Sequence, residues 1–203
     1  MAWRDDFRVA YDAAQVSWPV NYLLAWAEAE HAGSNNYEEK PLPGNERGEV
    51  GWFQIDPREA DKLGIDIDHV KMDPVYSIQS GAQVLDMYAA KIPSSYLGTA
   101  WWGMVKLWHG LPTLAKMVQD GVPSAGSWQE VYDWIQANVT GDDIKAISGV
   151  FHDPMKRADQ VSRVLASAGD LPEAGTVGGI GPITAIVIAG IFILAVGAIV
   201  ILA

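Results

Sequence analysis

Residues 48–56 read GEVGWFQID, which places two glycines, several bulky apolar residues and one glutamine close together. Glycine has no Cβ, so Gly51 is a candidate for a point where the backbone passes close to a ligand. The amide of Gln54 can both donate and accept hydrogen bonds, which suits a hydroxyl or amide of a sugar. Trp52 and Phe53, which lie between Gly51 and Gln54 in the sequence, are further candidate ligand contacts. A buried turn with a structural glutamine is the alternative interpretation.

Upstream of this stretch, residues 23–31 read LLAWAEAEH, an apolar helical pattern that ends in acidic residues. A carboxylate at the C-terminal end of a helix is unfavourable because the helix dipole is negative there. If Glu30 is also partly buried among aromatic residues, we expect a raised pKa, which suits a general acid. Glu28, two positions away, is expected on another face of the helix. Taken alone, the pattern fits solvated surface carboxylates better.

Helix-start signals recur along the chain and predict a mainly α fold. Helices are expected after Ser17, Asp56, Asp73, Ser127 and Asp153, and also at residues 97–109 and 112–119. The exception is residues 33–50, which are rich in Asn, Pro and Gly and show no periodicity. A long connection of this kind is often functional, and it has room for a short hairpin.

Together these segments resemble the soluble lytic transglycosylase and goose-type lysozyme superfamily. Ala25 and Glu30 have the spacing of the family's first motif, and residues 48–55 match the second motif at both glycines and at Gln-Ile. Residues 57–64 are similar to the segment that follows in the family. A later family helix is matched at Asp73, Pro74, Ile78, Gly81 and Ala82. The resemblance is good over residues 17–112 and looser up to residue 168.

The resemblance implies a lysozyme-like helical domain that cuts the β-1,4 bond from N-acetylmuramic acid (MurNAc) to N-acetylglucosamine (GlcNAc) in peptidoglycan. Glu30 would be the single catalytic acid/base. It would protonate the leaving oxygen and then activate either the muramyl 6-hydroxyl or water. Glu49 and Asp56 are nearby carboxylates that could orient water. No cofactor and no metal is implied.

The resemblance and the residue types together suggest a set of substrate contacts. The expected set is Gly51, Trp52, Phe53, Gln54, His31, Tyr96 and Trp108. Trp101, Trp102 and His109 are further groove candidates, although each suits the core better. The chain departs from the family at His31, where a serine is usual, and at Leu107 and Trp108, where a tyrosine and an asparagine are usual. These departures leave the sugar contacts open.

Three alternatives to a muramidase stand beside this interpretation. One is a catalytically inactive, membrane-anchored module that binds glycan or is structural. The second is a chitinase-like relative that acts on another N-acetylated glycan. The third is a membrane structural protein whose helical domain packs against partners.

Composition narrows the function classes. The net charge is −11 and the sequence contains no Lys/Arg cluster, so nucleic acid is not an expected ligand. The chain has no cysteine, which excludes disulfides, thiol catalysis and cysteine-bound metals. Its four histidines are scattered and do not form a ligand set.

The C-terminal part differs from the rest, because residues 174–203 carry no charge. Residues 181–203 are apolar and, at about 1.5 Å per residue, long enough to cross a bilayer core of about 30 Å. We therefore expect a transglycosylase domain at 1–168, a flexible linker at 169–180 and a transmembrane helix at 181–203.

The setting can be inferred from the two ends. The N-terminal MAWRDDFR does not resemble a secretory signal peptide. We expect a phage virion protein in an internal membrane that opens the host cell wall locally, at the periplasm, during entry. Its expected partners are peptidoglycan strands, the lipid membrane and other virion proteins.

Overall fold

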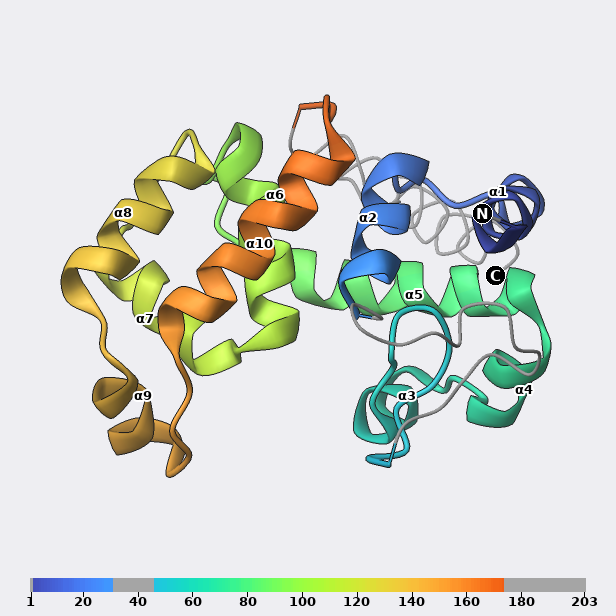
Figure 1. Cartoon of the computed structure of the whole chain (residues 1–203), viewed down its shortest axis with the longest axis horizontal. Helices are drawn as coiled ribbons and strands as arrows, with labels where there is room; N and C mark the ends of the chain where they lie inside the picture. The colour runs from blue at the N-terminus through green and yellow to red at the C-terminus, as the bar shows by residue number, and fades with distance from the viewer. Residues whose placement is uncertain (1, 31–45, 174–203) are drawn as a thin grey trace, which may run out of the picture.

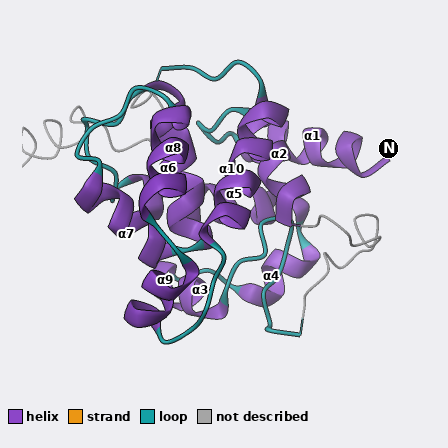
Figure 2. Cartoon of the chain, turned by 60° about the vertical axis from the view of Figure 1, so that its left-hand side comes forward, coloured by secondary structure: helices purple, strands orange, loops and turns teal. Residues whose placement is uncertain are grey.

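The structure, a computed structural model, describes residues 2–30 and 46–173, and over these residues it is built of helices without a strand (Figure 2). The long helix α5 (Pro74–Ala89) runs through the middle of the molecule, with α1 to α4 along it and α6 to α9 beyond its C-terminal end (Figure 1). The other helices are α1 (Ala2–Ala14), α2 (Val20–Glu30), α3 (Pro57–Leu63), α4 (Ile67–Met72), α6 (Gly98–Gly110), α7 (Pro112–Gly121), α8 (Trp128–Asn138), α9 (Gly141–Ser148) and α10 (Pro154–Ala168). The expected mainly α class is confirmed.

The capping signals in the sequence define several helix starts in the structure. Asp56 forms a capping box with Glu59 at the start of α3, and Gly64 ends that helix in the left-handed region at φ 67°. Asp73 and Asp153 accept backbone N–H bonds at the starts of α5 and α10. Because each cap satisfies N–H groups that have no helical partner, these starts follow from local sequence.

Three helices were not predicted from the sequence: α1, α4 and α9. In α1 the buried residues Trp3, Phe7, Ala10 and Ala14 recur at helical spacing and pack the helix against α5. The expected hairpin in residues 33–50 falls largely outside the described residues. Over the part that is described, an isolated antiparallel bridge between Val50 and Ile55 closes a tight turn.

An aromatic cluster fixes α2 against α6. Trp18 stacks with Tyr22 and with Trp101 at ring-centroid distances of 5.9 Å each, and Trp102 meets Tyr22 edge-on at 4.7 Å. The Tyr22 hydroxyl donates to the carbonyl of Trp102 at 2.7 Å. Trp26 lies one turn further along α2 and meets Tyr22 edge-on, so the cluster continues toward the C-terminal end of α2, which also packs against α10. The expected groove candidates Trp101 and Trp102 therefore belong to the core.

The domain extends beyond the expected boundary at residue 168. Asn21 donates to the carbonyl of Asp170 at 3.2 Å, and the Trp102 indole donates to the carbonyl of Pro172 at 3.1 Å. Asp170 and Pro172, which lie in the expected linker at residues 169–180, are therefore in hydrogen-bond contact with side chains of the domain. The expected span at 181–203 lies outside the described residues, and none of the helices described is both long and apolar enough to cross a bilayer.

Candidate active site

A polar cleft of about 400 Å³ opens beside the C-terminal end of α2. Four carboxylates and four basic side chains contribute to it, together with neutral polar groups. It is lined by Glu30, Arg47, Glu49, Gln54, Asp56, Arg58, Glu59, Lys62, Tyr88, His109, Gly110, Pro112 and Arg157. The expected catalytic Glu30 and the expected contact Gln54 thus line one cleft, as do the spare carboxylates Glu49 and Asp56.

Glu30 ends α2 against two basic side chains of α6. Its carboxylate is 17% exposed and accepts a hydrogen bond from the ammonium group of Lys106, which is only 2% exposed. The Nδ1 atom of His109 lies 3.5 Å from the same carboxylate oxygen. Lys106 Nζ also lies 4.3 Å from the ring centre of Trp26, so the cation contacts both a carboxylate and an aromatic face. Glu30, Lys106 and His109 are called the Glu30 side of the cleft below.

These neighbours reverse the expected pKa of Glu30. Burial alone would raise the pKa, but the positive charge and hydrogen bond of Lys106, with further contributions from His109 and Arg157, lower it below its ordinary value. The expectation of a raised pKa was therefore wrong, because it did not include a cation from α6. Burial lowers the pKa of His109 to about 4, so its imidazole is neutral at neutral pH. Burial also lowers the pKa of Lys106, although Glu30 opposes that shift.

A second group of side chains lines the cleft from α3, the turn before it and α5. Glu59 accepts a hydrogen bond from the Tyr88 hydroxyl and another from the backbone N–H of Asp56. Asp56 in turn pairs with Arg58 at 2.7 Å. Burial raises the pKa of Glu59 above its ordinary value, although the bond from Tyr88 lowers it in part. Gln54, Asp56, Arg58, Glu59 and Tyr88 are called the Glu59 side below.

The turn at residues 50–55 presents Gln54 to the cleft. Gln54 has a left-handed backbone at φ 49°, and its side-chain amide donates to the carbonyl of Gly51 at 2.9 Å. Gly51 does not contact the cleft. A Cβ there would lie 2.7 Å from Val70 and 2.8 Å from Ser77, so the glycine allows close packing against α4 and α5 rather than the approach of a ligand.

Trp52 and Phe53 do not line the cleft, contrary to their prediction as substrate contacts. They are 1% and 2% exposed, and both pack against Phe7 of α1. Phe53 also covers Gly81 of α5, where a Cβ would lie 2.2 Å from its ring. Their large apolar area makes burial more favourable than exposure to a polar cleft.

Two other predicted contacts also lie away from the cleft lining. Tyr96 is 1% exposed, donates to the carbonyl of Val122, and has a pKa raised to about 12 by burial. Trp108 is partly buried, with the ammonium group of Lys91 located 4.8 Å from its ring centre. His31 lies outside the described residues. Glu28 pairs with Arg4 at 2.6 Å, on a different face from Glu30 as expected.

The sequence interpretation missed Lys106, Glu59, Tyr88 and Arg157 as cleft or near-cleft residues. A signal for Lys106 was present, because it is the one Lys or Arg in the apolar stretch GTAWWGMVKLWHG of α6. A lysine is almost never fully buried without a partner, so such a position points to a buried carboxylate. Glu59 gave no comparable signal, because its position three residues after Asp56 is that of a helix-capping residue and does not by itself indicate a cleft.

Compared with protein-family models, curated proteins and solved structures, the chain matches none. Its chemistry is therefore argued from the cleft itself. Two carboxylates with oppositely shifted pKa values line one cavity, an arrangement that separates a charged role from a protonated one. Of the two, Glu30 is the carboxylate that stays charged to lower pH, and Glu59 is the one that takes up a proton first as the pH falls.

Proposed function

We propose that this chain cleaves the β-1,4 bond between MurNAc and GlcNAc in peptidoglycan strands, with Glu30 as acid and base. The observation that carries the proposal is the position of Glu30, which ends a buried helix and opens onto a polar cleft. Gln54 and three further carboxylates line the same cleft and offer hydrogen-bond acceptors and donors for sugar hydroxyls. The sequence resemblance to lytic transglycosylases and goose-type lysozymes supports the same role for Glu30.

In the proposed reaction, protonated Glu30 donates its proton to the glycosidic oxygen as the bond from that oxygen to C1 of MurNAc breaks. The N-acetyl group of the muramyl sugar stabilises the positive charge at C1. The Glu30 carboxylate then takes a proton from the muramyl 6-hydroxyl or from water as that oxygen attacks C1, which restores the acid. The first route gives a 1,6-anhydro product and the second gives a reducing end.

The contact with Lys106 determines the expected pH dependence. Since Lys106 lowers the pKa of Glu30, only a small fraction of Glu30 is protonated at neutral pH. Cleavage should therefore become faster as the pH falls below neutral. In the Lys106→Met variant the pKa of Glu30 rises, so the activity that survives should extend to higher pH. A pH profile that is the same in both proteins would contradict the proposed role of Glu30 as acid.

The test uses the full chain in a mild nonionic detergent with purified peptidoglycan, and reads the released fragments by mass. Glu30→Gln should reduce release by about 100-fold or more, the usual contribution of a general acid. Glu28→Gln, on the other face of α2, is the matched control and should retain activity. Anhydro fragments would assign the transglycosylase route and reducing ends the lysozyme route. No release by the wild type from several peptidoglycan types would refute cleavage.

A second candidate is a glycan-binding module without activity. The ion pair between Glu30 and Lys106 favours it, because a carboxylate held by a buried cation is a poor proton donor at neutral pH. Retention of the chain on peptidoglycan at every pH tested, without fragment release, would support this candidate over the enzyme.

We further propose that residues 181–203 hold the domain at a membrane, which would confine cutting to a local patch of cell wall. The uncharged, apolar sequence of this segment supports the anchor. This fits the local opening of a host wall during phage entry. Retention of the full chain in liposomes after an alkaline wash would test the anchor.

A further inference from the structure

A second cavity, of about 530 Å³, lies next to the proposed active-site cleft and differs from it in charge. It is lined by Ala29, Phe151, His152, Asp153, Lys156, Arg157, Gln160 and Arg163. We call these residues the α10 groove. Three of its side chains are Lys or Arg and one is acidic, in a protein with a net charge of −11. A basic groove on an acidic protein is suited to an anionic ligand.

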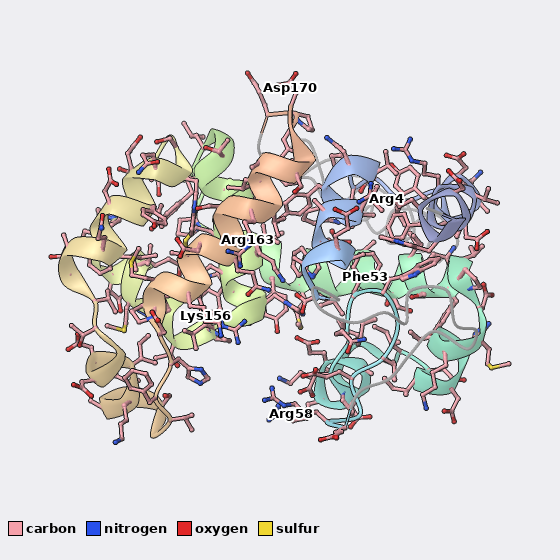
Figure 3. The ribbon with its side chains drawn as sticks, in the orientation of Figure 1. Arg4, Phe53, Arg58, Lys156, Arg163 and Asp170 are labelled. Carbon is pink, nitrogen blue, oxygen red and sulfur yellow. The ribbon has the colours of Figure 1, made fainter. Side chains whose placement is uncertain are left out.

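The basic side chains of the α10 groove are available for a ligand. Lys156 and Arg163 are exposed, and no carboxylate in the described part of the chain pairs with either of them. Lys156, Gln160 and Arg163 are spaced by four and three residues, so they share one face of α10. Figure 3 shows Lys156 and Arg163 along α10, to the left of α2 in that view. Arg58, which lines the cleft, lies on α3 below α2.

The α10 groove adjoins the cleft. Arg157 lines both cavities, and its guanidinium group donates to Gln160 at 2.9 Å. Ala29 lines the groove while the next residue, Glu30, lines the cleft, so the two cavities meet at the end of α2. A ligand whose sugar lies at Glu30 can therefore extend a side branch into the groove.

We propose that the α10 groove binds the carboxylates of the stem peptide attached to MurNAc, an inference that rests on the proposed function. The stem peptide starts from the lactyl group of MurNAc, next to the bond to be cut, and carries free carboxylates along its length. Lys156 and Arg163 are separated by about 10 Å along the helix. Carboxylates about three extended residues apart span a similar distance. Exposed Phe151 adds an apolar surface for alanine side chains.

An anionic lipid head group is the competing occupant, since the chain is proposed to lie at a membrane. Membrane recognition of this kind usually uses clusters of about four to eight Lys or Arg on an open surface. The α10 groove has three, and they line a cavity that adjoins the proposed catalytic cleft. These features favour a ligand that also occupies the cleft.

The test measures binding separately from cleavage. The full chain in nonionic detergent is titrated with a GlcNAc–MurNAc disaccharide that carries the stem peptide, and with the same disaccharide without it. The peptide should tighten binding to the wild type by about three- to tenfold, as expected for exposed charge pairs. The double variant Lys156→Gln/Arg163→Gln should lose this gain. The charge-matched control Arg8→Gln/Lys145→Gln, at exposed positions on other helices, should keep it.

Cleavage gives a second readout. On intact strands the double variant should raise KM by a similar factor with kcat unchanged, and on strands stripped of peptides by an amidase it should match the wild type. Peptide-dependent binding without cleavage would support the groove and refute the proposed activity. Equal binding of both disaccharides by the wild type would overturn the groove assignment, whether or not the chain cleaves. If the double variant binds both disaccharides like the wild type and loses binding only to soluble dihexanoyl phosphatidylglycerol, the groove is a lipid site. That result would also overturn the assignment to the stem peptide.

Discussion

Glu30 and Glu59 line the same cleft from different helices, and their surroundings shift their pKa values in opposite directions. Both are partly buried, and burial by itself raises the pKa of each. On the Glu30 side, Lys106 outweighs burial. On the Glu59 side, the neutral hydroxyl of Tyr88 offsets burial only in part. The difference teaches that the charge of the neighbouring group, more than burial itself, decides in which direction the pKa of each carboxylate shifts.

The two sides also differ in how the chain builds them. The Glu30 side depends on the packing of α2 against α6, which brings together Glu30 and Lys106 from positions 76 residues apart. The Glu59 side depends on short-range features, namely the turn at residues 50–55 and the capping box of α3. Substitutions on the Glu30 side should therefore affect global stability more, and those on the Glu59 side should act more locally.

The largest effect is expected from removing the buried cation. Lys106→Met leaves the Glu30 carboxylate without its partner, and loss of one member of a buried pair typically costs about 3–5 kcal/mol. Urea unfolding at neutral pH should show this loss of free energy of unfolding. The loss should shrink at acidic pH, where Glu30 takes up a proton.

Lys116→Met provides the matched control. Lys116 pairs with Asp120 on α7, but the side chains are 61% and 64% exposed. Exposed pairs contribute at most about 1 kcal/mol. Equal losses in the two variants would show that Lys106 and Glu30 do not form a buried pair. In a double-mutant cycle, Glu30→Gln with Lys106→Met should cost less than the sum of the single changes.

The pH dependence of stability should separate the two sides by sign. The folded pKa of His109 is about 4 against an ordinary value of 6.5, so the unfolded chain binds more protons between these values. Stability should therefore fall as the pH drops through this window, by on the order of 3 kcal/mol from His109. Urea unfolding of His109→Gln between pH 7 and 4 should show a flatter dependence. An equally steep fall in the variant would assign the effect to other groups.

Glu30 and Glu59 should give opposite trends in the same experiment. The lowered pKa of Glu30 contributes stability above its ordinary pKa, and this is lost as the pH falls through the folded value. The raised pKa of Glu59 contributes stability below its ordinary pKa, and this is lost as the pH rises through the folded value. The cost of Glu30→Gln should therefore grow toward neutral pH, and the cost of Glu59→Gln should grow toward acidic pH. Parallel trends would rule out the opposite shifts.

A smaller effect is expected at the turn that carries Gln54. Gly51→Ala places a Cβ 2.7 Å from Val70 and 2.8 Å from Ser77 at a left-handed φ of 74°. Overpacking of this kind typically costs about 1–3 kcal/mol, and the displaced turn should move Gln54 and lower the rate of cleavage. Gly64→Ala is the control, because its φ of 67° is similar but no atom lies within 4 Å of the added Cβ. Equal losses of stability would mean that backbone conformation alone, without the steric contact, accounts for the effect.

Local signals in the sequence predicted much of the fold. The caps at Asp56, Asp73 and Asp153 and the stop at Gly64 are interactions within a few residues, and the helices start and end where these residues indicate. Helix α1 was missed because its N-terminus carries no capping signal in the sequence. Its buried face is visible only from the spacing of Trp3 and Phe7 with later alanines.

The candidate site was predicted in part. Glu30 and Gln54 lie in motifs with recognisable spacing, and they do line one cleft. Trp52 and Tyr96 were misplaced because an aromatic residue suits a sugar face and a core equally well by type, and only packing decides between them. The pKa of Glu30 could not be predicted locally, since its partner Lys106 reaches it from a distant part of the chain.

The smallest effect sharpens the comparison at the Glu59 side. Tyr88→Phe removes the hydroxyl that donates to Glu59, and the loss of one such bond typically costs about 1 kcal/mol. Because that bond lowers the pKa of Glu59, its removal should raise the pKa further, which NMR titration of the Glu59 carboxyl carbon would measure. Tyr132→Phe, which removes a hydroxyl that donates to Asp159 at 2.8 Å on another helix pair, should leave that titration unchanged. A lower pKa of Glu59 in Tyr88→Phe would mean that water entering the gap solvates the carboxylate better than the tyrosine did, and the Glu59 side would then be controlled by solvent access rather than by Tyr88.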